Sequence, residues 1–305
     1  MQMSALLTKM ALFVIVILIG MFGARKKILT KEFNRGLSWL VVNIFIVAAV
    51  INSVISMDAS SFTMGELGFI LLISCVTYVV LYLLGALTVR ILRVDKEKAP
   101  QLELLMSVIN NLFVTLPVVE TIYGSKGAFI IALGCIPFNL LLFTYGLARL
   151  RGKGGKFRFK DILSTPLLAT VAAVLLFAFR VPVPTPIRSI LGSIAAATVP
   201  LSMLLVGSSL GSVDLRKALG DKSMLLLTAE RFLLAPVVVF LLMKLICPDE
   251  LLAGAMVVTA ASPSAILVTA LSLQTGRSGE YSSEGITVTT LLSMITIPLT
   301  VFLLL

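Results

Sequence analysis

Apolar runs of about 20 residues follow one another along almost the whole chain, and this feature constrains the fold more than any other. A helix needs about 20 apolar residues to cross the hydrocarbon core of a bilayer. Of the 305 residues, 58% are hydrophobic and 13% are charged, whereas about 25% are charged in soluble proteins. The sequence therefore predicts an all-α integral membrane protein with a single transmembrane domain over residues 1–305. The ten predicted spans are 4–23, 37–56, 67–89, 101–122, 127–149, 162–180, 187–210, 222–246, 250–273 and 283–304.

Most basic residues lie in the loops that follow the odd-numbered spans. These loops hold 19 of the 25 lysines and arginines. By the positive-inside rule they face the cytoplasm, so we expect a multi-pass protein of the plasma membrane with both termini outside. The net charge of +10 then follows from topology. We expect the lipid bilayer, and not nucleic acid, as the partner of this charge.

A basic loop at 150–161 divides the predicted spans into five before it and five after it. An odd number of spans in each half makes the two halves enter the membrane from opposite sides. Any structural repeat between residues 1–149 and 162–305 must therefore be inverted, as in many secondary transporters. Spans 4 and 9 are each the fourth span of their half and correspond to each other in such a repeat.

Spans 4 and 9 each carry a proline among small polar residues. Proline removes a backbone donor and clashes with the carbonyl four residues back, so we expect helix breaks at Pro117 and Pro263. In lipid such breaks are tolerated only where protein or water covers them, and paired broken helices are typical of substrate sites near the bilayer midplane. The alternative is that each proline only kinks its helix. The expected substrate-binding residues are Asn110, Asn111, Thr115, Pro117, Thr259, Ser262, Pro263 and Ser264.

The polar groups at the two expected breaks indicate the chemistry of a ligand. N-termini of half-helices carry partial positive charge and free N–H groups, which suit a carboxylate, and neutral amide and hydroxyl side chains add hydrogen bonds. No basic side chain is expected at the site. We therefore expect transport of a small organic anion, a mono- or dicarboxylate, by alternating access. A channel and an intramembrane enzyme are the alternatives from other functional classes.

Charged residues inside the predicted spans are further candidates for function, because such charges are costly in a membrane. Glu120 and Glu230 are candidates for coupling transport to an ion. The alternative for Glu120 is that it is solvated near the outer surface. The alternative for Glu230 and Arg231 is that they snorkel to the cytoplasmic face or pair with charges on other helices. We expect Glu103 to lie at the membrane interface.

Composition and motifs exclude several kinds of chemistry. The chain has no histidine, which excludes catalysis by histidine and histidine metal ligands, and it has no Walker-type phosphate-binding loop. We therefore expect no enzymatic activity, no metal site and no cofactor. Gly207 and Gly211 are four residues apart, a spacing that favours close helix packing.

Five segments of the sequence, in order, resemble the auxin efflux carrier family, which includes bacterial malonate and malate permeases and the plant auxin exporters. The resemblance is to a bacterial member. The first segment carries an asparagine seven residues before a proline and then a Tyr–Gly pair, here Asn110, Pro117 and Tyr123–Gly124. The five segments are INNLFVTLPVVETIYGSKGAFIIALGCIPFNLLLFTYG, VPLSMLLVGSSLG, ERFLLAPVVVFLL, ASPSAILVTALSLQTG and TTLLSMITIPL.

The resemblance implies ten helices in two inverted five-helix repeats, with helices 4 and 9 crossing at their breaks. It also implies that spans 1, 2, 6 and 7 form one bundle and that spans 3–5 and 8–10 form another. A homodimer is left open. Sodium-coupled bile-acid-type symporters share this general fold and are the alternative within the class. Unlike many family members, the chain has no proline in its second helix, which carries Asn43 and Asn52, and its central loop is short, so auxin is not inferred as the substrate.

Overall fold

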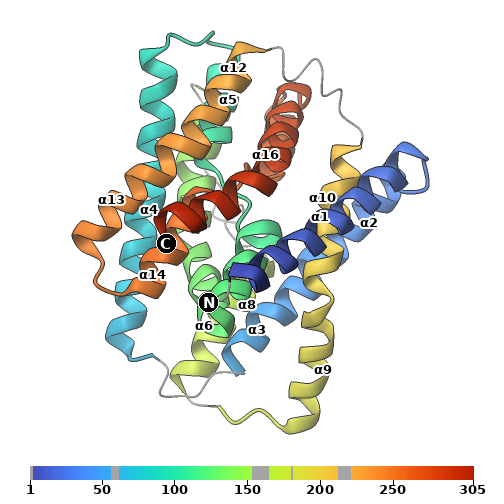
Figure 1. Cartoon of the computed structure of the whole chain (residues 1–305), viewed down its shortest axis with the longest axis vertical. Helices are drawn as coiled ribbons and strands as arrows, with labels where there is room; N and C mark the ends of the chain where they lie inside the picture. Colours follow the sequence, from blue (N-terminus) through green and yellow to red (C-terminus); the bar gives the residue numbers. More distant parts are fainter. Residues whose placement is uncertain (1–2, 56–61, 153–164, 180, 212–220) are drawn as a thin grey trace. The chain divides into compact units, whose positions relative to one another are not determined.

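The computed structural model describes residues 3–55, 62–152, 165–179, 181–211 and 221–305. These residues form helices joined by short turns (Figure 1), and the only β pairing among them is one isolated bridge. The prediction of an all-α protein is therefore confirmed for the described part of the chain. The predicted basic loop 150–161 lies outside the described residues from position 153 onward.

The helices are listed in chain order, with η marking a π-helical segment. In the first half they are α1 (Met3–Arg25), α2 (Lys31–Leu40), η1 (Val41–Phe45), α3 (Ile46–Ile55), α4 (Met64–Ile91), α5 (Ala99–Ser107), η2 (Asn111–Thr115), α6 (Leu116–Leu141), η3 (Leu142–Gly146) and α7 (Leu147–Arg151). In the second half they are α8 (Thr165–Ala178), α9 (Thr185–Ala196), α10 (Thr198–Leu210), α12 (Lys222–Ala229), η5 (Glu230–Leu234), α13 (Ala235–Ile246), α14 (Glu250–Ala260), α15 (Leu267–Gln274) and α16 (Glu280–Leu304).

Helical segments that are long and apolar enough to cross a membrane recur through the described residues. One of them, Asn111–Arg151, has 41 residues and is interrupted at Gly124, whose φ of 68° and ψ of −158° are not helical. Each of the ten predicted spans overlaps at least one helix, and the number of crossings stays a prediction. The six long segments are Glu32–Ser53, Met64–Ile91, Asn111–Arg151, Thr185–Ser208, Lys222–Ile246 and Glu280–Leu304, and the three shorter apolar ones are Ala11–Arg25, Leu167–Ala178 and Glu250–Ala260.

Two π-helical segments end two residues before a proline. η2 ends before Pro117, and η5 ends before Pro236. Because a proline ring clashes with the carbonyl four residues earlier, a single wider π turn at this point keeps the helix continuous. The expected break of span 4 at Pro117 is therefore wrong in position. The backbone leaves the helix earlier, at Val108–Asn110, between α5 and η2.

The chain divides into two compact units, each of which contains parts of both halves. Predicted spans 1, 2, 6 and 7 belong to the first unit and spans 8–10 belong to the second, as the family resemblance implies. Residues 67–72, at the start of span 3, and residues 112–136, in the second half of span 4 and the start of span 5, instead belong to the first unit. The first unit is Met1–Leu72, Leu112–Ile136 and Leu163–Ser212, and the second is Ile73–Asn111, Pro137–Ile162 and Val213–Leu305.

Close helix contacts in the first unit depend on glycine. In this unit α1 lies along α10 (Figure 1), and α3 packs on α8 and α9. A Cβ on Gly207 would overlap the carbonyl group of Ile17 in α1, and a Cβ on Gly211 would collide with Met21. The prediction that this glycine pair serves helix packing is confirmed.

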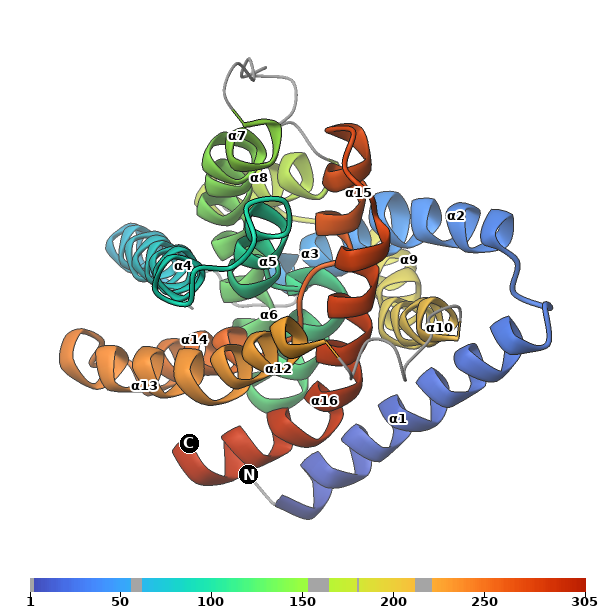
Figure 2. The same cartoon turned by 90° about the horizontal axis from the view of Figure 1, so that it is seen from above.

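In the second unit, α13 lies beside α14 (Figures 1 and 2), and α5 packs on α12, α15 and α16. Gly285 of α16 allows this close approach, because side-chain atoms of Leu105 in α5 and Leu227 in α12 occupy the space that a Cβ would need. The last turn of α5 is thus packed closely against α12 and α16.

The start of α12 is stabilised by an acidic N-cap. The carboxylate of Asp221 accepts hydrogen bonds from the backbone N–H and the hydroxyl of Ser223, at 2.8 and 2.6 Å, and it lies 2.9 Å from Nζ of Lys98. The hydroxyl of Ser223 and the ammonium group of Lys98 lower the pKa of Asp221 to about 2. A carboxylate at a helix N-terminus also interacts favourably with the helix dipole.

Candidate functional site

The break between α5 and η2 and the break between α14 and α15 meet in the second unit. Pro263 lies between α14 and α15, so the expected break of span 9 at this proline is confirmed. Ile109 lies opposite Ser264 in an antiparallel bridge. Because a break in lipid must find partners for its backbone groups, each break supplies the partners of the other. The Asn110 N–H donates to the Pro263 carbonyl at 2.9 Å, and the Ala265 N–H donates to the Val108 carbonyl at 3.0 Å.

Side chains from other elements hold the last turn of α5 beside these paired breaks. The final carbonyls of a helix have no partner within the helix. Here the Ser264 hydroxyl donates to the carbonyl of Leu105 at 2.6 Å. Nη1 of Arg231 donates to the carbonyl of Met106, also at 2.6 Å. The α5 terminus is therefore bound to the α14–α15 break and to η5.

The hydroxyl groups of the predicted site donate to backbone carbonyls. Ser262 donates to the carbonyl of Val258 at 2.8 Å, and Thr259 donates to the carbonyl of Ala255 at 2.7 Å. These two hydroxyls and that of Ser264 are completely buried. Their donors are therefore used within the protein, and only acceptor positions remain for a ligand.

The N–H groups at the paired breaks are also used within the protein. In addition to the two that join the breaks, the Asn111 N–H donates to the carbonyl of Ile109 at 2.9 Å, and the Ser264 N–H donates to the hydroxyl of Thr289 at 3.2 Å. They are paired because unpaired backbone groups are too costly in an apolar environment. These four N–H groups are therefore not available to a carboxylate, and the expectation of free N–H groups at the first residues of the half-helices stays a prediction.

The amide of Asn111 differs from the hydroxyl groups described above. Its side chain is 2% exposed, and neither its nitrogen nor its oxygen has a hydrogen-bond partner in the described residues. Burying such a group without partners costs about 1–3 kcal/mol. Asn110, directly before it, is also buried. A buried amide with both ends open is suited to a ligand that supplies a donor and an acceptor.

Two charged side chains at the start of η5 are buried, where the sequence suggested snorkelling. Glu230 is 2% exposed and Arg231 is completely buried. The alternative that they snorkel is wrong, because Arg231 reaches inward to the Met106 carbonyl. The expectation of no basic side chain at the site is also wrong, since this guanidinium lies beside the paired breaks. Sequence alone gave only the presence of a charged pair inside an apolar span.

Glu103 is likewise buried against other parts of the protein, at 1% exposure, and its position at the membrane interface stays a prediction. Its carboxylate accepts hydrogen bonds from the hydroxyl of Tyr145 at 2.5 Å and from Nε of Arg149 at 2.7 Å. The negative charge is therefore compensated within the second unit. No other role is needed to explain the presence of this carboxylate.

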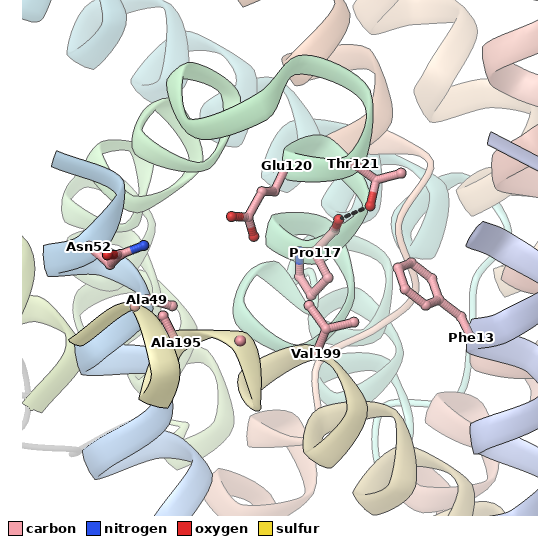
Figure 3. A pocket seen from close by; sticks show the side chains of 10 residues that line it. Phe13, Ala49, Asn52, Pro117, Glu120, Thr121, Ala195 and Val199 are labelled. Carbon is pink, nitrogen blue, oxygen red and sulfur yellow. Dashed lines mark hydrogen bonds between the residues drawn. The ribbon is translucent and has the colours of Figure 1, made fainter. Parts of the chain in front are cut away.

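Three of the sequence-predicted residues belong to the first unit: Thr115, Pro117 and Glu120. Pro117 and Glu120 line a pocket of about 440 Å³ formed by α1, α3, α6, α9 and α10. Figure 3 shows the Glu120 carboxylate and the Asn52 side chain pointing into it, while the Thr121 hydroxyl donates to the Pro117 carbonyl at 2.9 Å. The lining residues are Phe13, Ala49, Asn52, Pro117, Glu120, Thr121, Gly192, Ala195, Ala196 and Val199.

This pocket includes one residue that sequence analysis did not assign to the site. Asn52 was noted only because its helix lacks a proline, yet an amide inside an apolar run was a usable signal. Glu120 is exposed to the pocket, as expected for a solvated carboxylate. Among the described residues, no group of three Cys, Asp or Glu lies close enough together to hold a metal ion.

Apolar helices throughout, and breaks that pair in the middle of two of them, are features of a multi-pass membrane transport protein. Comparison with known proteins agrees. The model of the membrane transport protein family matches residues 5–162 and 149–301, so almost the whole chain is covered in two halves. The chain belongs to this family, the auxin efflux carrier family. It is therefore a transporter and not an enzyme.

Two curated relatives are similar over nearly their full length. An uncharacterized transporter of Methanothermobacter thermautotrophicus is 25% identical over 289 residues, which cover 93% of this chain and 94% of the relative. An uncharacterized transporter of Methanocaldococcus jannaschii is 28% identical over 300 residues, again covering 93% and 94%. The names of these relatives give transport without a substrate.

Proposed function

We propose that the chain is a secondary transporter that moves a small organic anion, a mono- or dicarboxylate, across the plasma membrane by alternating access. In this proposal ten spans form two inverted five-helix repeats, and both termini lie outside. The two family matches, one in each half, support a repeat. The odd number of predicted spans per half requires that the repeat be inverted.

The observation that carries the proposal is the open amide of Asn111 beside the paired breaks. An amide offers one acceptor and two donors, so it can bind a carboxylate oxygen and a hydroxyl or protonated acid group of the same ligand. The acceptor lone pairs of Ser262 and Thr259 would serve the hydroxyl groups of a hydroxy acid. Neutral groups of this kind add hydrogen bonds to the ligand without adding a fixed charge to the site.

The charge of the transported anion determines whether its transport must be coupled to the movement of another ion. Outward movement of a carboxylate along the membrane potential gains about 2.3 kcal/mol per charge per 100 mV. Export therefore needs no coupled ion, whereas uptake does. Glu120, in the pocket of the first unit, and Glu230, in η5, are the proposed coupling residues for uptake.

The test is counterflow in proteoliposomes that contain the purified full-length protein. The external panel comprises monocarboxylates, dicarboxylates, amines and sugars, each with sodium or with choline as the cation. We expect exchange of at least one carboxylate, and no exchange of amines or sugars. Exchange of amines alone would refute the organic-anion assignment. An absolute requirement for sodium would favour a symporter of the bile-acid type.

A further inference from the structure

Arg231 is the largest fully buried side chain of the described residues, and most of its hydrogen-bonding capacity is unused. Nη1 donates to the carbonyl of Met106 at 2.6 Å. Nε and Nη2 have no hydrogen-bond partner in the described residues. A guanidinium has five N–H donors in a fixed planar arrangement, so one whole edge of this group is open in the sense that its donors have no partner among the described residues.

The open edge has the geometry that a carboxylate requires. Nε and Nη2 lie on the side of the guanidinium opposite to the Nη1 contact, and their N–H bonds point in nearly parallel directions. Such a pair can bind both oxygens of one carboxylate, which is the strongest and most directional form of this interaction. The contact with Met106 fixes the plane of the group and so orients the open edge.

Glu230, the neighbour in sequence, is close enough to interact electrostatically with this guanidinium but does not bind it directly. No ion pair joins the two side chains, and both carboxylate oxygens of Glu230 lack a hydrogen-bond partner in the described residues. Adjacent residues of a helix point in different directions. Glu230 lines a separate, mostly apolar hollow of about 520 Å³ beside α4, with Ile91 and Leu233 among its walls.

A buried cation without a paired anion is strongly unfavourable, so the chain must gain something by retaining it. As a helix cap alone, the group would need only the Nη1 contact. Arg231 donates to the carbonyl of Met106, and Asn111 follows Met106 by five residues in the sequence. The two side chains with open hydrogen-bonding groups therefore flank the break at Val108–Asn110.

We propose that Arg231 is the anion-binding residue of the transporter, and that its Nε–Nη2 edge holds the carboxylate of the cargo. This inference rests on the organic-anion function proposed above. The ligand class is a carboxylate with a small polar remainder, bound at one end by the guanidinium of Arg231 and within reach of the polar groups near the breaks.

The test compares an acid with its neutral amide in thermal-shift titrations and in proteoliposome uptake. Arg231→Lys keeps a positive charge that can still reach Met106. It loses the Nε–Nη2 pair of donors that can bind both oxygens of one carboxylate. Arg277→Lys is the matched control, because Arg277 also donates to backbone carbonyls of the second unit, those of Leu150 at 2.8 Å and Glu97 at 3.1 Å. We expect the preference for acid over amide to fall at least tenfold in Arg231→Lys and to stay unchanged in Arg277→Lys.

A purely structural role would weaken the binding of acid and amide in equal proportion, and an unchanged preference in a folded Arg231→Lys protein would overturn the inference. The wild-type protein supplies a second measurement that needs no variant. If it binds the neutral amide as tightly as the acid, no guanidinium holds the carboxylate. Carboxylate transport with either of these results refutes the role of Arg231 alone, whereas transport of non-acidic substrates only refutes the proposed function as well.

Discussion

Replacing Asn111 by leucine should stabilise the protein and abolish transport. Leucine has the same branched shape as asparagine with somewhat larger terminal groups, and the amide that it replaces is buried with neither end hydrogen-bonded in the described residues. An unsatisfied buried polar group costs about 1–3 kcal/mol, and the apolar side chain removes that cost. The backbone N–H of residue 111 keeps its bond to Ile109, so the paired breaks remain intact.

Ser264→Ala provides the contrasting change at the same place. The hydroxyl of Ser264 donates to the buried carbonyl of Leu105 at 2.6 Å, and its removal leaves that carbonyl without this donor. The expected cost is again about 1–3 kcal/mol, but of opposite sign. A change of 1 kcal/mol in the free energy of unfolding shifts the Tm by roughly 2–4 °C for a domain somewhat smaller than this chain. The two variants should therefore differ in Tm by several degrees.

The assay is thermal unfolding of both variants in detergent, combined with carboxylate counterflow of Asn111→Leu in proteoliposomes. A higher or unchanged Tm together with lost counterflow indicates that the Asn111 amide is reserved for the ligand. If Asn111→Leu lowers the Tm as much as Ser264→Ala does and still transports, the amide is a packing element and the reasoning is refuted.

Three other predictions concern packing, electrostatics and topology. Gly207→Ala should destabilise the protein by about 1–3 kcal/mol through overpacking against α1, whereas Gly36→Ala, which meets no atom within 4 Å, should stabilise it slightly; equal Tm values would contradict this. Asp221→Ala should cost about 1 kcal/mol as a lost N-cap. Because folding lowers the pKa of Asp221 to about 2, the charge contributes at neutral pH and its contribution disappears as the pH falls from about 4 toward 2, so the advantage of wild type over Asp221→Asn should shrink in that range. Finally, in a background without native cysteines, Lys96→Cys should be labelled from the cytoplasmic side and Glu250→Cys from outside; labelling of both from one side would exclude the proposed topology.

Local sequence signals predicted those parts of the fold that depend on local chemistry. The apolar runs gave a helical membrane protein, and Pro263 gave the position of one break. The spacing of Gly207 and Gly211 gave a close helix contact, because only a residue without a side chain permits it. Each of these properties is determined by a residue and its near neighbours in the sequence.

The parts that could not be predicted depend on contacts between distant segments. The first break lies at Val108–Asn110, and not at Pro117, because residues about 155 positions later supply its hydrogen-bond partners. The β-branched side chains of Val108 and Ile109 favour extended backbone, but they could not locate the break without that partner. Arg231 was misplaced for the same reason, since its acceptor at Met106 is 125 residues away.

The pairing of the breaks has a consequence for how a carrier can release its ligand. If free backbone N–H groups formed the anion site, they would lose their partners each time the ligand left, at a cost of several kcal/mol per group in an apolar environment. Here the Asn110 N–H donates to the Pro263 carbonyl and the Ala265 N–H donates to the Val108 carbonyl. These two N–H groups therefore keep their partners whether or not a ligand is bound. In the proposed mechanism, the empty and loaded states then differ mainly at the side chains of Asn111 and Arg231. A small free-energy difference between these states is what allows one site to bind on one side of the membrane and release on the other.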